Sequence, residues 1–448
     1  MTTAPPHRAA AAAPAARVAF AEALKVWLKI GLLGFGGPAG QIALMHRMLV
    51  EERGWISERR FLTALNFCML LPGPEAMQLA TYVGWTLHRT LGGLVAGILF
   101  VLPGACVILA LSIVYAAFHH LPAVDAIFYG VKPAVAAIVA EALFRVGRRA
   151  LRSRLHAGLA VAAFLGIFFL DLPFPLIVFA AALVGFCWPQ AFASSGEERD
   201  EAADDRPPAL RRTLGTAAIW LGLWLVPVAL LWLRFGADQI YTTIALFFSQ
   251  MAMVTFGGAY AVLAYVAQEA VGHFGWLSPG EMVDGLGLAE TTPGPLILVL
   301  QFVGFMAAYR APGMLDPILA GSIGAAVTLW VTFTPCFLWI LVGAPYIETL
   351  GRIRALAGAL GAITAAVAGV IANLTVWFAL HVLFREVAER HWHGLRLVLP
   401  QPASLDPAAL LLTIAAALAL LRFRVGLLPT LAVTAVAGAL WHALSSMF

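Results

Sequence analysis

Charged residues are scarce in this chain, and their scarcity argues against a soluble globular protein. Asp, Glu, Lys and Arg make up 12% of its 448 residues and hydrophobic residues 61%, whereas soluble globular proteins carry about 25% charged residues. Apolar stretches of about 18–25 residues recur along the chain, long enough to cross a bilayer as helices. The period-two alternation of a transmembrane β-barrel is missing. We therefore expect an all-α polytopic membrane protein.

Cysteines and catalytic motifs are also few. The four cysteines lie in separate apolar segments: Cys68, Cys106, Cys187 and Cys336. No CxxC pair or Cys/His spacing indicates a metal or redox site, and no nucleotide-binding motif is present. The formal charge of +4 gives no indication of nucleic-acid binding. We expect a protein that is not an enzyme, with no cofactor and no metal.

Three short motifs occur twice, and each recurs 221 residues later (256 minus 35 for the first). A constant offset without gaps indicates an internal duplication. The repeated motifs are FGG at 35–37 and 256–258, GW at 54–55 and 275–276, and PGP at 72–74 and 293–295.

Each PGP motif lies inside apolar, helix-like sequence. Proline inside a helix removes a hydrogen bond and clashes with the preceding turn. The sequence therefore predicts a broken helix in each copy, over residues 57–89 and 281–309. The structural alternative is that PGP only kinks a packed helix, but two copies at one offset make that alternative weaker.

The polar stretch 190–212 divides the chain into two halves. The first half has six predicted crossings, and an extra apolar span without a counterpart there follows the polar stretch. The second copy therefore begins on the opposite side of the membrane, and the two copies are inverted. The predicted organisation has about thirteen spans. Its parts are a disordered tail (1–16), the first repeat (17–189), a cytoplasmic linker (190–212), the extra helix (213–233) and the second repeat (234–448).

The arginine run at 145–154 predicts the orientation, because positive loops stay in the cytoplasm. It places the N-terminus and the linker inside a cell inner (plasma) membrane and the C-terminus on the periplasmic or extracellular side. Residues 381–396 are too polar to cross, and we expect an interfacial helix there.

Matched broken helices in inverted halves are the best sequence indication of a transport site. The half-helix that begins at each PGP directs its positive N-terminal end to the membrane midplane, which favours an anion. The predicted substrate-binding residues surround the FGG and PGP motifs: Gly36, Gly37, Pro38, Arg47, Pro72, Gly73, Pro74, Gln78, Gly257, Gly258, Thr291, Thr292, Pro293, Gly294, Pro295 and Gln301.

Two carboxylates flank the breaks unequally. Glu75 follows the first PGP, and Glu290 precedes the second, next to Thr291 and Thr292. Intramembrane acids are functional by default, so both are candidates for proton coupling. The alternatives are stabilisation of a helix N-terminus by Glu75 and a solvated interface position for Glu290. We expect Thr291 or Thr292 to cap the second half-helix.

Other polar residues within or near the spans complete the set of candidates. Arg47 is a candidate anion ligand, with lipid-headgroup anchoring as the alternative. Lys132 lies inside a span, where snorkelling to the interface is the alternative. Glu141 and Asn373 lie late in matched spans and are expected to form a polar pair.

The motifs resemble those of the chromate transporter family in its long two-domain form. The resemblance covers both halves, and one departure is Ala264, where a proline is expected. It implies export of chromate across the inner membrane, and thus chromate resistance. It rests on GFGGP (34–38), LLPGPE (70–75), FVLPG (100–104), FGGAYAVL (256–263) and MVDGLGLAETTPGPLILVLQFVGF (282–305).

Without the resemblance, the residues predict only a transporter for an anion, and they leave proton antiport open. Sulfate or another oxyanion is an alternative substrate, because discrimination against an isostere is weak. A membrane-embedded enzyme and a conduction channel are the competing classes. The expected partners are a small inorganic anion and membrane lipids; the sequence leaves a homodimer open.

Overall fold

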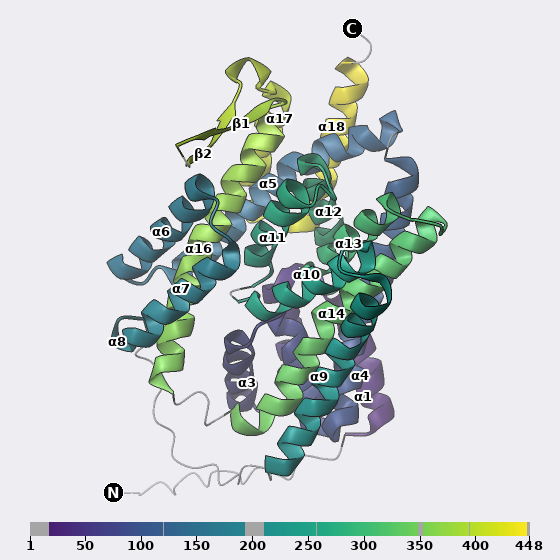
Figure 1. Cartoon of the computed structure of the whole chain (residues 1–448), viewed down its shortest axis with the longest axis vertical. Helices are drawn as coiled ribbons and strands as arrows, with labels where there is room; N and C mark the ends of the chain where they lie inside the picture. Colours follow the sequence, from purple (N-terminus) through teal and green to yellow (C-terminus); the bar gives the residue numbers. More distant parts are fainter. Residues whose placement is uncertain are drawn as a thin grey trace, which may run out of the picture.

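The structure is a computed structural model that describes residues 18–119, 121–192, 210–256, 258–347, 353–393 and 395–445. These residues are almost entirely helical, with one short β-hairpin (Figure 1). Six of the described helices are long and apolar enough to cross a membrane, and five more apolar helices are shorter. The all-α polytopic class is therefore confirmed, whereas the count of thirteen spans stays a prediction. The predicted tail and most of the predicted linker lie outside the described residues.

The first copy contains the helices that the apolar stretches predicted. They are α1 (Phe20–Leu33), α2 (Gly37–His46), the π-helical turn η1 (Arg47–Glu51), α3 (Glu58–Leu70), α4 (Glu75–Phe118), α5 (Pro122–Ala150), α6 (Arg154–Leu170), α7 (Phe174–Cys187) and the short α8 (Pro189–Phe192).

Helix α9 (Leu210–Phe235) corresponds to the predicted extra span, and the second copy follows it. The helices of the second copy are α10 (Ile240–Val254), α11 (Ala259–Ala267), the π-helical turn η2 (Gln268–His273), α12 (Pro279–Glu290), η3 (Leu296–Leu298), α13 (Val299–Arg310), α14 (Pro317–Gly343), η4 (Ala344–Tyr346), α16 (Arg354–Leu383), η5 (Pro402–Ser404), α17 (Pro407–Leu421) and α18 (Leu427–Ser445).

The two copies agree in local detail. Both have a π-helical turn at the same place, and the following helix is capped by an equivalent serine: Ser57 accepts from the backbone of Arg60, and Ser278 from that of Glu281. Such caps satisfy orphan N–H groups at a helix start. In α4 the backbone leaves helical angles at His88, the place where α13 and α14 separate in the second copy.

The C-terminal helix pair of each copy packs on the other copy. Helices α6 and α7 pack against α16, whereas α17 and α18 pack against α5 (Figure 1). Glycines allow these close approaches, as small residues do at membrane helix interfaces. Gly185 faces Gly358 between α7 and α16, and Gly130 faces Gly438 between α5 and α18. The copies are therefore intertwined by a reciprocal exchange of hairpins.

The interfacial helix predicted over 381–396 is wrong. Helix α16 continues to Leu383, and strand β1 (Val387–Trp392) then pairs antiparallel with β2 (Leu395–Pro400), with Val387 opposite Pro400. His393, in the two-residue connection, has φ of +50°. Two-residue hairpin turns require such left-handed angles. The His393-Gly394 pair before an apolar run was therefore a turn signal that the helical interpretation missed.

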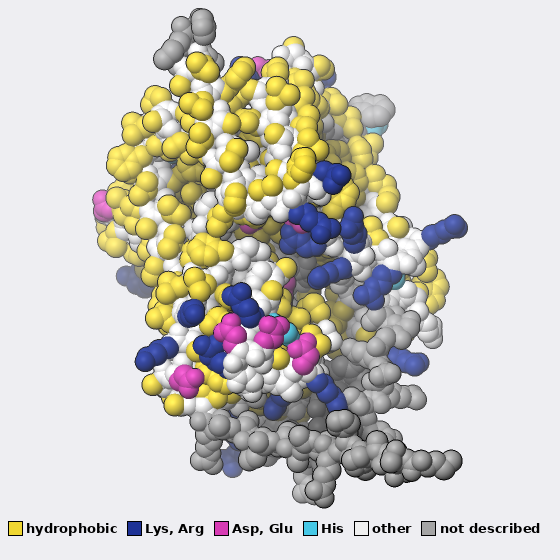
Figure 2. Space-filling view, turned by 180° about the vertical axis from the view of Figure 1, so that it is seen from behind, with side chains coloured by type: hydrophobic (Ala, Val, Ile, Leu, Met, Phe, Trp, Pro, Cys, Tyr) yellow, Lys and Arg dark blue, Asp and Glu magenta, His cyan; other side chains and the backbone are white. Residues whose placement is uncertain are grey.

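The outer surface is what a lipid environment requires. Large apolar side chains stay exposed along the spans, including Leu233 on α9 and Phe179 on α7. Figure 2 shows broad hydrophobic areas, with the Lys, Arg, Asp and Glu side chains mostly gathered in the middle and lower parts of the face. The buried core lies between the copies and includes Phe100 on α4 and Phe302 on α13.

Candidate functional site

Each PGP break contacts the FGG region of the other copy. Both breaks place a glycine at positive φ, +120° at Gly73 and +92° at Gly294. The Gly73 N–H donates to the carbonyl of Thr255 (2.8 Å), and the Gly294 N–H donates to that of Gly34 (3.0 Å). Thr255 and Gly34 are equivalent residues, one position before each FGG motif. The two hydrogen bonds are therefore reciprocal, and each ties one break to the other copy.

The two predicted proton-coupling carboxylates reach the same short segment. A Cβ at Gly258 would lie 3.9 Å from Oε1 of Glu75, which belongs to the other copy. Two residues further on, the hydroxyl of Tyr260 donates to Oε1 of Glu290 (2.6 Å). Glu290 is buried, and Glu75 is partly exposed at the start of α4. Residues 258–260 thus approach both acids.

Arg145 supplies a positive charge at this centre. It forms an ion pair with Glu141 one helical turn earlier on α5, and it lies near enough to Glu290 and Tyr260 for their charges to interact. The arginine run at 145–154 predicted a cytoplasmic loop that begins at Arg145. Helix α5 continues to Ala150, so Arg145 lies on the helix. The spacing of four residues between Glu141 and Arg145 was a usable signal, since such pairs face each other on a helix.

Three buried glutamines donate to backbone carbonyl groups at the breaks or next to them. Unpaired backbone groups at membrane depth are costly. Gln78 and Gln301 were predicted to bind substrate, and Gln41 was missed because it is not repeated at 262. The side-chain amides donate to backbone carbonyls: Gln41 to Gly34 and Gly294, Gln78 to Pro72, and Gln301 to Ala105.

The two threonines at the second break have a different role from the one predicted. Thr291 donates to the carbonyl of Leu288 (2.8 Å), and Thr292 donates to that of Ala289 (2.9 Å). Their hydroxyls therefore close the end of α12, and the prediction that one of them caps the following half-helix is wrong. Pro295 precedes that helix without a side-chain cap. Thr291 is nevertheless exposed at the break.

Arg47 is not brought to the centre, and Glu141 has a different partner from the one expected. Arg47 is 62% exposed and pairs with Glu52 (3.6 Å) on the π-helical turn. Glu141 pairs with Arg145, and Oδ1 of Asn373 has no hydrogen-bond partner among the described residues, so the expected pair of Glu141 with Asn373 does not form.

The glycines of the FGG turns fit the left-handed backbone there. Gly36 and Gly37 have φ of +85° and +67°, and Gly258 has +97°; glycine adopts such angles without steric cost. Pro38 follows in the first turn of α2. Gly257 lies outside the described residues.

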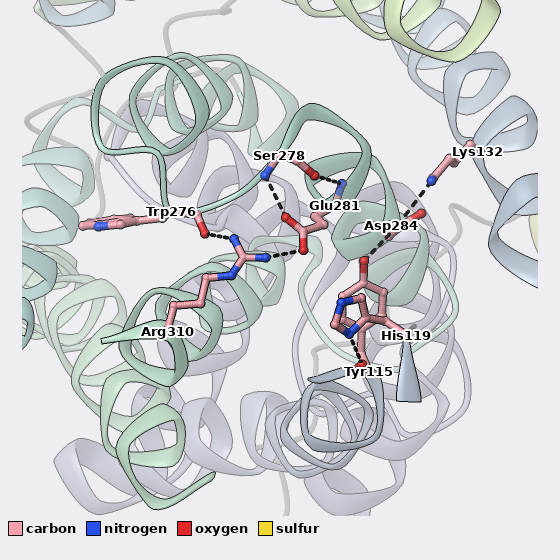
Figure 3. Close-up of polar contacts among 8 residues, drawn as sticks. All are labelled: Tyr115, His119, Lys132, Trp276, Ser278, Glu281, Asp284 and Arg310. Carbon is pink, nitrogen blue, oxygen red and sulfur yellow. Dashed lines mark hydrogen bonds and ion pairs between the residues drawn. The ribbon is translucent and has the colours of Figure 1, made fainter. Parts of the chain in front are cut away.

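A second polar cluster lies between α4, α5, α12 and α13 (Figure 3). Its cavity has a volume of about 440 Å³. The hydroxyl of Tyr115 donates to Oδ2 of Asp284 (2.9 Å), and Nζ of Lys132 lies 3.6 Å from the same oxygen. Beside this group, Glu281 pairs with Arg310. Lys132 was predicted as an intramembrane residue, whereas Asp284 was missed because it has no equivalent acid in the first copy.

These features define the class of the protein. It is an internally duplicated helical membrane protein in which each of two broken helices contacts the other copy. A sequence model described as "Chromate transporter" matches residues 21–186 and 242–441, which coincide with the two copies. The chain belongs to the chromate transporter family, a family of transporters rather than enzymes. No solved structure matches the chain.

Three relatives illustrate the likeness. The chain is 32% identical to the "Chromate transport protein" of Pseudomonas aeruginosa, over 78% of this chain and 79% of the relative. It is 31% identical to the "Probable chromate transport protein" of Synechococcus elongatus, over 78% and 82%. The "Chromate transport protein" of Cupriavidus metallidurans is 28% identical, over 79% and 81%.

Proposed function

We propose that this protein exports chromate from the cytoplasm across the inner membrane and so confers chromate resistance. The observation that carries the proposal is the pair of reciprocal hydrogen bonds that ties each break to the other copy, close to residues 258–260 and within electrostatic reach of Arg145. Helix N-termini and a guanidinium group are suitable ligands for an oxyanion. Family membership supports chromate as the substrate.

The exchanged hairpins and the reciprocal hydrogen bonds support the inverted arrangement of the copies. In this arrangement the N-terminus and linker are cytoplasmic and the C-terminus is periplasmic. Membrane potential assists the outward movement of a dianion by about 2.3 kcal/mol per charge per 100 mV. Proton antiport through Glu75 and Glu290 adds to this driving force, because both carboxylates lie at the junction.

Everted membrane vesicles test the direction and the substrate. Export predicts that they accumulate chromate, and that an ionophore which collapses the potential lowers the rate. If vesicles with the protein take up no more chromate than vesicles without it, the proposal is wrong. Uptake of sulfate in preference to chromate would instead establish a sulfate transporter.

Two variants test the proton coupling. Glu75→Gln and Glu290→Gln should each abolish the stimulation of chromate uptake by a pH gradient while leaving the response to potential. Glu22→Gln is the control, since Glu22 is an exposed acid in the first turn of α1. Coupling through these residues is excluded if both variants keep the full stimulation.

A further inference from the structure

The cavity beside Asp284 carries an inference about how protons and anions are linked. Asp284 is 4% exposed, yet its Oδ1 has no hydrogen-bond partner among the described residues, and the residue lines the cavity. A buried acceptor without a partner costs about 1–3 kcal/mol. Its surroundings are therefore suited to a ligand that this oxygen can hold.

The contacts of the other carboxylate oxygen favour a proton over a metal cation. Lys132 and Tyr115 both approach Oδ2, so a cationic ammonium group already accompanies the carboxylate. A metal ion needs several anionic or imidazole ligands. The described residues contain no group of three or more His, Cys, Asp or Glu side chains that could hold one.

Charged and titratable groups face Asp284 from the helices that enclose the cavity. Lys132 lines the cavity, its side chain is 27% exposed, and it forms an ion pair with Asp284. Arg310 is held by Glu281 and by the carbonyl of Trp276. Figure 3 draws Tyr115 from α4, His119 directly after it, Lys132 from α5, Glu281 from α12 itself and Arg310 from α13. Asp125 from α5 also lines the cavity.

We propose that Asp284 is a second proton-binding site, separate from the central junction, and that its protonation releases Lys132 to bind the transported oxyanion in the cavity. A hydronium ion transfers its proton to Oδ1 and leaves water, and the neutral acid no longer holds the ammonium group of Lys132. The freed lysine and the Tyr115 hydroxyl then face an anion in the cavity. This inference rests on the proposed transport of an oxyanion.

The test measures proton uptake when sulfate binds to the purified full-length protein. Sulfate stays a dianion between about pH 5 and about pH 8, whereas chromate takes up a proton of its own. Calorimetric titrations in buffers of different ionisation enthalpy give the protons absorbed per anion bound. We expect sulfate affinity to rise as the pH falls, with net proton uptake in the wild type.

Asp284→Asn should bind sulfate with smaller proton uptake, and its affinity at about pH 8 should approach that of the wild type at about pH 5. Asp125→Asn is the matched control, because Asp125 lines the same cavity but is exposed; it should behave like the wild type. Unchanged proton uptake in Asp284→Asn would overturn the inference.

Tyr115→Phe provides a second test that does not remove the carboxylate. It deletes one hydrogen bond to the charged form of Asp284, so the midpoint of proton uptake should move to higher pH. An unchanged midpoint would contradict the inference. Chromate transport by the wild type is measured separately in everted vesicles; its absence would refute the proposed function but would leave the sulfate result interpretable.

Discussion

Helices α3 and α12 are equivalent in the two copies, but only α12 is enclosed. On α12, Met282 and Leu286 are 0% exposed, whereas on α3, Leu62 and Met69 are 45% and 50% exposed. Helix α12 packs against α5 and α13, while α3 packs chiefly against α4. The same local architecture thus occurs in two packing states.

The difference between the two helices follows from charged residues that only one side has. Asp284 on α12 corresponds to Thr63 on α3, which is exposed. The ion pair of Asp284 with Lys132 of α5 therefore has no equivalent at this position of α3, and breaking it should affect one side alone.

The largest expected effect is on the rate of chromate transport, when the positive charge of Arg145 on α5 is removed. Arg145→Gln leaves Glu141 and Glu290 without their positive partner. Losing a hydrogen bond to a charged group costs about 1.5–3 kcal/mol, and each 1.4 kcal/mol is a factor of about ten in rate. Chromate uptake by everted vesicles should fall by about tenfold or more. Arg148→Gln, an exposed position on the same helix, is the control, and equal uptake by the two variants would contradict the assignment.

The next largest effect is on stability against unfolding. The two exchanged hairpins should contribute equally to it. In Gly358→Leu, a Cβ would lie 2.5 Å from the carbonyl oxygen of Gly185, and in Gly130→Leu one would lie 2.1 Å from that of Thr434. Overpacking of this kind costs about 1–3 kcal/mol. Thermal unfolding in detergent should show a similar loss for both variants.

Gly222→Leu on α9 serves as the control for these two variants, since nothing lies within 4 Å of a Cβ there. It should unfold at the wild-type temperature. A loss in only one of the two hairpin variants would mean that the exchange is unequal between the copies.

A smaller effect should come from making the two FGG regions alike. Gln41→Val introduces the residue found at the equivalent position 262 and removes the donor to Gly34 and Gly294. The carbonyl of Gly34 keeps the Gly294 N–H as a donor, but that of Gly294 is left without one among the described residues, which costs about 1–3 kcal/mol. The midpoint of thermal unfolding should fall, and Val262→Gln should not restore it. Wild-type stability in Gln41→Val would show that the two junction contacts do not depend on this amide.

The smallest effect concerns the π-helical turns, where His46 of the first copy corresponds to Ala267. The hydrogen bond from His46 to Glu58 raises the pKa of the imidazole, against a lowering by burial, and the charges of Glu58 and Glu51 raise it further. A raised pKa means that protonation stabilises the folded state below the ordinary value of about 6.5 and that this stability is lost as the pH rises through the raised value.

His46→Gln should therefore lower the unfolding temperature at about pH 6 and leave it unchanged at about pH 8.5, well above the ordinary histidine pKa. The contact is at the surface, so the effect should stay below about 1 kcal/mol. An equal shift at both pH values would indicate a packing role for His46 instead of a charge interaction.

Local signals made much of the fold predictable. Proline and glycine in PGP interrupt a helix whatever surrounds them, and apolar length identifies the spans, so α3, α4, α12 and α13 lie close to where the sequence placed them. The hairpin at 387–400 was missed because charge along 381–396 was interpreted as a helix surface. The junction near Glu75 and Glu290 was expected from the repeat. The roles of Thr291 and Thr292 were not, because a hydroxyl can close the end of one helix or cap the start of the next.

The sequence by itself determined the membrane class, the duplication and the position of the two breaks, because each depends on composition or on residues close together in the chain. Only the tertiary structure decided which side chains meet at the breaks and in the second cavity. Lys132 forms an ion pair with Asp284 across about 150 residues, and Arg145 lies close enough to Glu290 for their charges to interact. These contacts depend on how α5 packs on α12 between the exchanged hairpins, and no pattern within either segment specifies that packing.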